Sequence, residues 1–154
     1  MKKLSLITAA LCTLLLNANL HAIEFEIQNI CEESPYLSKN IKINGPTNAG
    51  DITIQVLNDW NVPYIGSVDS ITSMLGTITG LDSYEVISDT EMRIYGWCYE
   101  VDGLQPDVLM SEYMVNPAVH SKIYWYYGSA HYLEGEWLSY CDPVYKLKPD
   151  FICK

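Results

Sequence analysis

The sequence predicts an α+β domain in which one helix packs across a mostly antiparallel sheet, with two disulfides holding the chain together. Several segments alternate apolar and polar residues with the period of a strand, while one segment has helical spacing. Four cysteines follow a start that has the features of an export signal. Because the alternating segments outnumber the helical one, we expect the sheet to dominate the fold.

Residues 1–22 have the features of a secretory signal peptide. Lys2 and Lys3 give the positive start, residues 4–16 give the apolar stretch, and the segment ends on a small residue, so we place the cut after Ala22. The apolar stretch is shorter than the roughly 20 residues that cross a bilayer, so no membrane span is expected. The sequence therefore predicts a periplasmic or secreted protein.

A lipid anchor is the alternative use of this leader, because Cys12 lies within it. Leu11 stands immediately before this cysteine, where a lipid-attachment site requires a small residue. Motif matches without their context are usually accidental, so we do not expect a lipoprotein.

Cleavage after Ala22 would leave residues 23–154, the size of one domain. Seven basic residues and nineteen acidic residues remain, which gives a formal charge of −12. Such a surface repels phosphate backbones and anionic lipid. We therefore expect neither nucleic acid nor a membrane surface as a partner, and solubility is the simplest role of the charge.

Four cysteines belong to the predicted mature chain: Cys31, Cys98, Cys141 and Cys153. An even number in an exported chain predicts two disulfides, for which three pairings exist. From chain order we favour Cys98 with Cys141, and Cys31 with Cys153. No two of the four have the close spacing of a zinc-binding pair, so no metal site is expected.

The first half of the chain predicts strands and the single helix. Alternation indicates strands over Ile23–Gln28, Ile41–Ile43 and Asp51–Leu57. Ser67 has the features of an N-cap, and apolar residues at helical spacing follow it as far as Gly80. These patterns predict a helix over residues 67–80.

The second half predicts the longer strands. Residues 91–101 alternate clearly, and Asp102-Gly103 after them is a hairpin signal. A short strand at 86–87, a strand at 123–127 and a last hairpin over 132–141 complete the elements. On the resulting faces, the aromatic residues expected in the core are Trp97, Tyr99 and Trp125.

Two motifs in this half carry a resemblance to a known family. Tyr-Gly-Trp-Cys-Tyr-Glu-Val-Asp-Gly occupies residues 95–103, and Ile-Tyr-Trp-Tyr-Tyr-Gly occupies 123–128. Together with the Gly66-Ser67 helix start, they resemble the transcobalamin-like C-terminal domain family over about residues 52–129. The family's usual Gly-Asp pair before the last strand is replaced by His120-Ser121-Lys122.

The resemblance implies a β-grasp-like fold and a non-enzymatic binding role. In animal vitamin B12 carriers this domain closes over a corrinoid, which makes cobalamin or a related corrinoid a candidate ligand here. The helical partner domain of those carriers has no counterpart in this chain, so the ligand rests on analogy of fold.

Aromatic residues are the candidate binding groups, because nine of twelve tyrosines and three of four tryptophans lie between residues 95 and 145. Such residues can fill a core or offer a stacking surface to a flat ligand. Alternation places Tyr124 and Tyr126 opposite the core face, and Tyr132 and Trp137 fall in the last hairpin. These four are the predicted ligand-binding residues.

Catalytic alternatives have weaker support. Ser129 and His131 are neighbours in sequence, but a hydrolase serine normally lies on a strand-to-helix turn. His131 and Glu134 alone do not make a metal site. We predict no catalytic residues, and two alternatives remain: a secreted hydrolase or effector with a dispersed site, and an accessory subunit that binds an extracytoplasmic protein.

Overall fold

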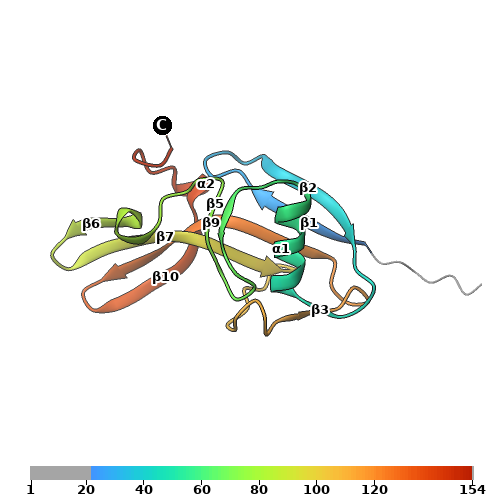
Figure 1. Ribbon diagram of the computed structural model, residues 1–154. Coiled ribbons are helices and arrows are strands. Elements are labelled where there is room, and N and C mark those ends of the chain that lie inside the picture. Colours follow the sequence, from blue (N-terminus) through green and yellow to red (C-terminus); the bar gives the residue numbers. More distant parts are fainter. Residues whose placement is uncertain (1–21, 154) are drawn as a thin grey trace, which may run out of the picture.

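The computed structural model describes residues 22–153, which form one mixed sheet of six strands with a helix across one face (Figure 1). The strands of this sheet are β1 (Ala22–Gln28), β2 (Pro35–Lys42), β6 (Tyr84–Ser88), β7 (Glu91–Val101), β9 (Lys122–Leu133) and β10 (Glu136–Pro143). The smaller elements are β3 (Thr47–Asn48), α1 (Ala49–Asp59), β4 (Tyr64–Gly66), β5 (Ile71–Met74), β8 (Met114–Val115) and α2 (Val144–Leu147). The protein is therefore α+β and dominated by its sheet, as predicted.

The predicted signal peptide lies outside the described residues except for Ala22. Within residues 22–153, no helix is long and apolar enough to span a bilayer.

The long strand β9 organises the sheet. One edge of β9 pairs with β7 in an unbroken antiparallel register from Ile123 to Leu133. Its other edge is shared: β1 pairs in parallel with the first part of β9, and β10 pairs antiparallel with the last part. The sheet therefore has a half near β1 and β2 and a half formed by the β6–β7 and β9–β10 hairpins, which extend together in Figure 1.

The strand predicted over Asp51–Leu57 is wrong, because this segment forms α1. Asn48 caps the helix, since its side chain accepts a hydrogen bond from the Asp51 N–H at 2.7 Å. The buried residues of α1 have helical spacing, and they include the polar Thr53: Ala49, Gly50, Ile52, Thr53, Val56 and Leu57. Burial against the sheet therefore outweighs the strand propensity of Ile52, Ile54 and Val56.

The helix predicted over residues 67–80 is also wrong, because residues 67–74 form the turn and second strand of the β4–β5 hairpin and residues 75–79 lead to a 3₁₀ helix at Gly80–Ser83. The Ser67 hydroxyl does accept a hydrogen bond from the Asp69 N–H, at 3.1 Å, but inside a turn. Val68 is exposed, whereas Ile71 and Met74 are buried. The hydroxyl geometry that resembled an N-cap is therefore that of a turn.

The other predicted strands are confirmed. β1 and β7 span the expected segments, β2 and β6 contain residues 41–42 and 86–87, and β9 and β10 form the last hairpin. The strand predicted at 123–127 and the first strand of that hairpin are one continuous strand, β9. Asp102-Gly103 forms the expected turn, with Val101 and Leu104 hydrogen-bonded in both directions at 2.9 and 3.0 Å. The chain leaves the sheet after Leu104, so this turn does not start a further strand.

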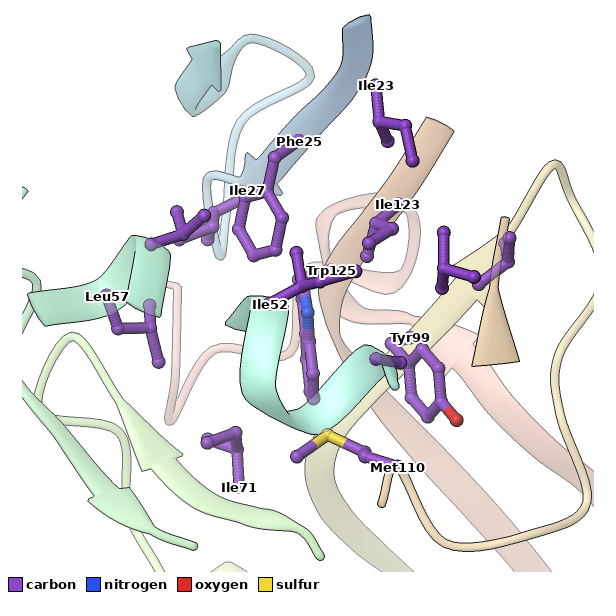
Figure 2. Close-up of a cluster of buried hydrophobic side chains, with 14 of the residues drawn as sticks. Ile23, Phe25, Ile27, Ile52, Leu57, Ile71, Tyr99, Met110, Ile123 and Trp125 are labelled. Atoms are coloured by element: carbon purple, nitrogen blue, oxygen red, sulfur yellow. The ribbon is translucent and has the colours of Figure 1, made fainter. Parts of the chain in front are cut away.

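The main core lies between α1 and the half of the sheet near β1 (Figure 2). The predicted core residue Trp125 is 1% exposed and donates from its indole N–H to the Thr53 hydroxyl at 3.2 Å. Tyr99 stacks on Trp125 with ring centroids 5.2 Å apart. Trp97 is partly buried at the margin of the core, so all three predicted core aromatics pack there.

Both predicted disulfides are confirmed. Cys31 joins Cys153 across 122 residues, and Cys98 joins Cys141 across 43. The first holds the C-terminal segment against a second, smaller core around Tyr95, Tyr127 and Val144. Two disulfides fit a protein that folds in an oxidising, extracytoplasmic compartment.

Candidate functional site

The half of the sheet built from the two long hairpins has an apolar face that no element within residues 22–153 covers. Side chains alternate along a strand, and directly paired residues share a face. The pairings place these residues on that face: Tyr84, Val86, Met92, Ile94, Gly96, Cys98, Gly128, Ala130, Tyr132 and Trp137. None of them carries a charge. We call this set the open face.

Beyond the small core around Tyr95 and Tyr127, the other side of the same strands is polar. Arg93 forms an ion pair with Glu85 at 3.3 Å, and His131 contacts Glu91 at 2.9 Å. The Tyr95 hydroxyl donates to Glu85 at 2.7 Å. In the part of the hairpins beyond that core, charged groups occupy one side and apolar groups the other, so the apolar side is the uncovered one.

A hollow of about 280 Å³ lies in the centre of the open face. Gly96 and Gly128 are paired directly across β7 and β9, and Ala130 follows on the same face. Ile94 and Tyr140 also line the hollow. The sheet backbone is therefore partly exposed at Gly96, whereas Gly128 is buried, and larger side chains surround the hollow.

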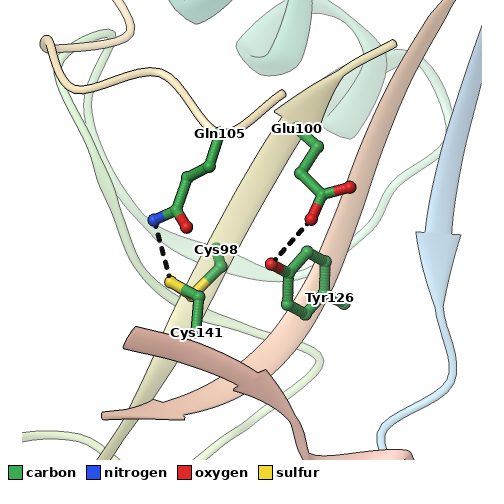
Figure 3. The surroundings of a disulfide bond; sticks show 5 residues. All are labelled: Cys98, Glu100, Gln105, Tyr126 and Cys141. Atoms are coloured by element: carbon green, nitrogen blue, oxygen red, sulfur yellow. Dashed lines mark hydrogen bonds between the residues drawn. A yellow bond between two sulfur atoms is a disulfide. The ribbon is translucent and has the colours of Figure 1, made fainter. Parts of the chain in front are cut away.

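The Cys98–Cys141 disulfide forms one wall of the hollow. Cys98 belongs to β7 and Cys141 to β10, so the bond crosses over β9, which lies between them (Figure 3). A Cβ atom on Gly128 would lie 3.1 Å from both the Cys141 Cα and the Cys98 Sγ. Gly128 is therefore a glycine because the bridge passes directly above it. The Gln105 side chain donates to the Cys141 Sγ at 3.1 Å beside this bridge.

The two glycines at the centre of the hollow have different surroundings. A Cβ atom on Gly96 would meet no heavy atom within 4 Å, in contrast to one on Gly128. The backbone of Gly96 does not have a positive φ. A side chain at position 96 would therefore extend into the hollow rather than into protein.

Tyr124 and Tyr126, two of the predicted ligand-binding residues, form a stacked pair with ring centroids 5.3 Å apart. The Tyr126 hydroxyl donates to Glu100 at 3.0 Å (Figure 3), and that of Tyr124 donates to Gln28 at 3.2 Å. Tyr126 is only 3% exposed. Burial, and for Tyr126 also the bond to Glu100, raises the pKa of each phenol. The pair packs within the protein beside the hollow.

Tyr132 and Trp137, the other two predicted residues, lie at the far end of the open face. Their rings meet edge to face at 5.3 Å, and Trp137 lies 5.9 Å from Tyr140. Trp137 and Tyr140 are 39% and 64% exposed. These three aromatic residues form a row along the open face that reaches the hollow at Tyr140, while none of the four predicted residues lines the hollow itself.

Sequence reasoning missed Tyr140 and the small-residue floor. Strict alternation from Trp137 places Tyr140 on the opposite side, but β10 has a register shift between Ser139 and Asp142, and Cys141 has φ 57°. Gly96 and Gly128 did carry a signal, because a glycine inside a strand often marks a close approach of another backbone or of a ligand.

The remaining polar groups form no evident catalytic site. Within residues 22–153, no three histidine, cysteine or acidic side chains lie close enough together to hold a metal ion. Ser129 is buried, and its hydroxyl has no hydrogen-bond partner among the described residues, so His131 does not activate it. His120 accepts from the Asn116 N–H at 2.9 Å and closes a loop.

Comparisons with family models, with curated proteins and with solved structures find no match for this chain. The resemblance to the transcobalamin-like family therefore stays a prediction.

Proposed function

We propose that this protein is an exported, non-enzymatic binding module whose site is the open face. The observation that carries the proposal is the hollow, in which Gly96 and Ala130 leave the backbone partly exposed at the centre of an aromatic, uncharged sheet face. Large uncovered apolar surfaces on small proteins commonly mark binding sites. The full chain has a formal net charge of −10, so an uncharged surface stands out against the rest of the protein.

The shape and chemistry of the site favour a flat, uncharged ring. A planar ligand lying over Gly96 would contact backbone and Ile94, and its edge would meet Tyr140 and the disulfide. Aromatic side chains stack on rings with centroids about 4.5 to 7 Å apart. None of the residues that line the hollow is charged, so a strongly charged ring would lose hydration without gaining an ion pair.

A corrinoid is the specific form of this proposal, together with a β-grasp-like fold and membership of the transcobalamin-like family. The open face supports it by offering a broad surface to one side of a large ring. The hollow alone, at about 280 Å³, is near the lower end of the sizes of small-molecule sites. A corrinoid would therefore lie across the face rather than inside a cavity.

Fluorescence titration tests the proposal, because Trp137 lies in the aromatic row beside the hollow. The mature protein is titrated with cobalamin and, separately, with smaller uncharged aromatic rings, and we expect saturable quenching. Gly96→Val adds a side chain whose Cβ meets no heavy atom within 4 Å, so it should occupy part of the hollow and weaken binding at least about tenfold, roughly 1.4 kcal/mol. Thr72→Val, on an exposed position of β5, is the matched control and should bind normally.

Two outcomes would contradict these claims separately. No saturable change with cobalamin at high micromolar concentration would remove the corrinoid form. Binding that Gly96→Val leaves unchanged would show that the ligand does not occupy the hollow. The thermal midpoint of Gly96→Val should stay near that of the unmodified protein, which separates lost binding from lost folding.

A further inference from the structure

The outer edge of β7 has a gap in its pairing. β6 pairs with β7 only as far as Ile94, and Leu104 pairs with Val101. Between them, residues 95–100 have no partner strand on this edge within the described part of the chain. Six residues of a strand extend over roughly 20 Å, which is long enough for a short added strand.

The direction of the backbone groups in this gap follows from the turn at its end. The Val101 N–H and C=O bond to Leu104, so they point away from β9, and the Asp102 N–H bonds to the Lys122 carbonyl of β9. Backbone groups alternate in direction along an antiparallel strand. Trp97 and Tyr99 therefore direct their N–H and C=O groups into the gap.

The segment after β7 makes one pairing contact at this edge, through Leu104, and then leaves the edge. Asp102 and Gly103 have φ of 51° and 79°, which is the two-residue turn that normally joins paired strands. Leu104 makes the first pair, but Gln105 and Pro106 follow, and proline has no N–H to donate. No strand from residues 22–153 therefore pairs with β7 beside Trp97 and Tyr99.

A cleft of about 240 Å³ lies along the same edge. On the α1 side it is lined by apolar residues from β5 and from the loop after β7, including Ile71, Leu109 and Met110. Tyr99 also lines the cleft, and its hydroxyl is buried with no hydrogen-bond partner among the described residues. The edge thus combines free backbone groups, an apolar lining and an unpartnered hydroxyl.

We propose that this edge binds an extended polypeptide segment, which adds to β7 as an antiparallel strand between β6 and Leu104. Residues of the segment opposite Trp97 and Tyr99 share their face and would enter the apolar side of the cleft. The residue between them, opposite Cys98, would point toward Gln105 on the other side. The segment therefore has apolar residues at alternating positions, with a small or polar residue between them.

This binding mode differs from that of the open face, because the main chain of the partner supplies most of the hydrogen bonds. The cleft adjoins the hollow at the Cys98–Cys141 bridge and Gln105. Filling the hollow with Gly96→Val should nevertheless leave peptide binding intact, so the two proposals can fail separately.

The probe is an acetylated and amidated hexapeptide of alternating threonine and valine, used with two analogues. Each analogue carries N-methyl groups on alternate residues, so that one blocks one edge of the peptide strand and the second blocks the other. We expect the parent peptide to shift the amide resonances of Trp97 and Tyr99 and to slow their hydrogen exchange. One analogue should bind at least about tenfold more weakly than the parent, because it cannot donate to β7.

A pair of variants tests the apolar lining. Leu109→Asp places a carboxylate in the cleft and should weaken peptide binding at least about tenfold. Leu138→Asp is the matched control, since Leu138 on β10 has similar exposure, 55% against 51%, and does not line the cleft. Both substitutions are at exposed positions and should leave the protein folded.

The proposal is overturned if the Trp97 and Tyr99 amides do not respond to the parent peptide at millimolar concentration. It is also overturned if both methylated analogues bind as well as the parent, since side chains and not the main chain would then be recognised. A response of the same amides to protein concentration alone would identify a second copy as the occupant and would contradict a foreign segment.

Discussion

The strands β7 and β9 run through both halves of the sheet. In one half their alternating side chains form a buried core, and in the other they form the open face. Near β1, one side of the sheet is covered by α1, and Trp125 and Tyr99 are buried there. In the half beyond Gly128, the side that faces away from α1 carries Tyr132, Trp137 and Tyr140 at the surface. One pair of strands therefore carries both a sealed core and an open apolar face.

The difference shows that aromatic content alone does not distinguish a core from a site. A tryptophan in the covered half contributes to the free energy of folding through burial and close packing. A tryptophan on the open face keeps much of its surface in contact with water, so binding of a ligand that covers this surface is favourable. The covering element decides which role an aromatic residue has.

Exchanging the two tryptophans for alanine gives the largest expected contrast. Trp125→Ala should lower the free energy of unfolding by about 3 to 5 kcal/mol, because it opens a cavity and removes the bond to Thr53. Trp137→Ala should cost about 1 kcal/mol or less, since only its contacts with Tyr132 and Tyr140 are lost. Urea unfolding measures both, and equal losses would show that the two halves do not differ as described.

Removing each disulfide separately sharpens the comparison. Replacing Cys98 and Cys141 together by alanine, or Cys31 and Cys153 together, should each cost about 2 to 4 kcal/mol. Only the first pair walls the hollow, so only its removal should also weaken ligand binding. Melting curves and titrations on both double variants test this. The distinction fails if removing Cys31 and Cys153 weakens binding equally.

Much of the sheet could be predicted from the sequence, because alternation is a local signal. The segments of β1, β7 and β9 each have one dry side, and their pattern needs no knowledge of the partner strand. The disulfide pairing followed from chain order and is confirmed. Local patterns were sufficient wherever the conformation that a segment favours by itself is also the one that it adopts in the sheet.

The sequence predicts a strand where the structure has the helix α1, and a helix where it has the β4–β5 hairpin. In both segments the local pattern favours a conformation that the surrounding structure does not allow. Ile52, Ile54 and Val56 favour a strand by propensity, yet Asn48 caps a helix there and the sheet buries one side of it. Ser67 has the residue type of an N-cap but stabilises a turn. Contacts with distant segments determine both conformations, and local sequence patterns do not show these contacts.

The candidate site was only partly predictable for a related reason. Tyr132 and Trp137 lie in the last hairpin and on the open face, whereas Tyr126 is buried. The hollow depends on the register shift in β10 that brings Cys141 over Gly128. A register shift has no signature in residue type, so Tyr140 could not be assigned to the open face from alternation.

The paired glycines give a smaller and more local contrast. Gly128→Ala should cost about 1 to 3 kcal/mol, because its Cβ would lie 3.1 Å from backbone that the disulfide holds in place. Gly96→Ala meets no atom within 4 Å and should be neutral or slightly stabilising. Thermal unfolding of both variants checks this, and a neutral Gly128→Ala would show that β10 moves freely above β9.

The smallest expected effect concerns Asp102, which fixes the start of β9 to the end of β7 in the covered half. Its carboxylate accepts from the Ser121 hydroxyl at 2.6 Å, the Ser121 N–H at 3.1 Å and the Lys122 N–H at 2.9 Å. Burial acts to raise the pKa of Asp102, but these hydrogen bonds outweigh it and hold the pKa below its ordinary value.

A lowered pKa in the folded state means that ionised Asp102 contributes stability above its unfolded pKa, about 3.9, and that this contribution disappears as the pH falls through the folded value. Asp102→Asn should therefore cost less than about 1 kcal/mol at neutral pH, because the site is exposed, and nothing once the pH is below the folded pKa. Asp107→Asn, at an exposed position nearby, is the control. Denaturant unfolding from pH 2 to 7 measures the difference, and a constant difference across that range would show that the carboxylate charge does not hold the two strands together.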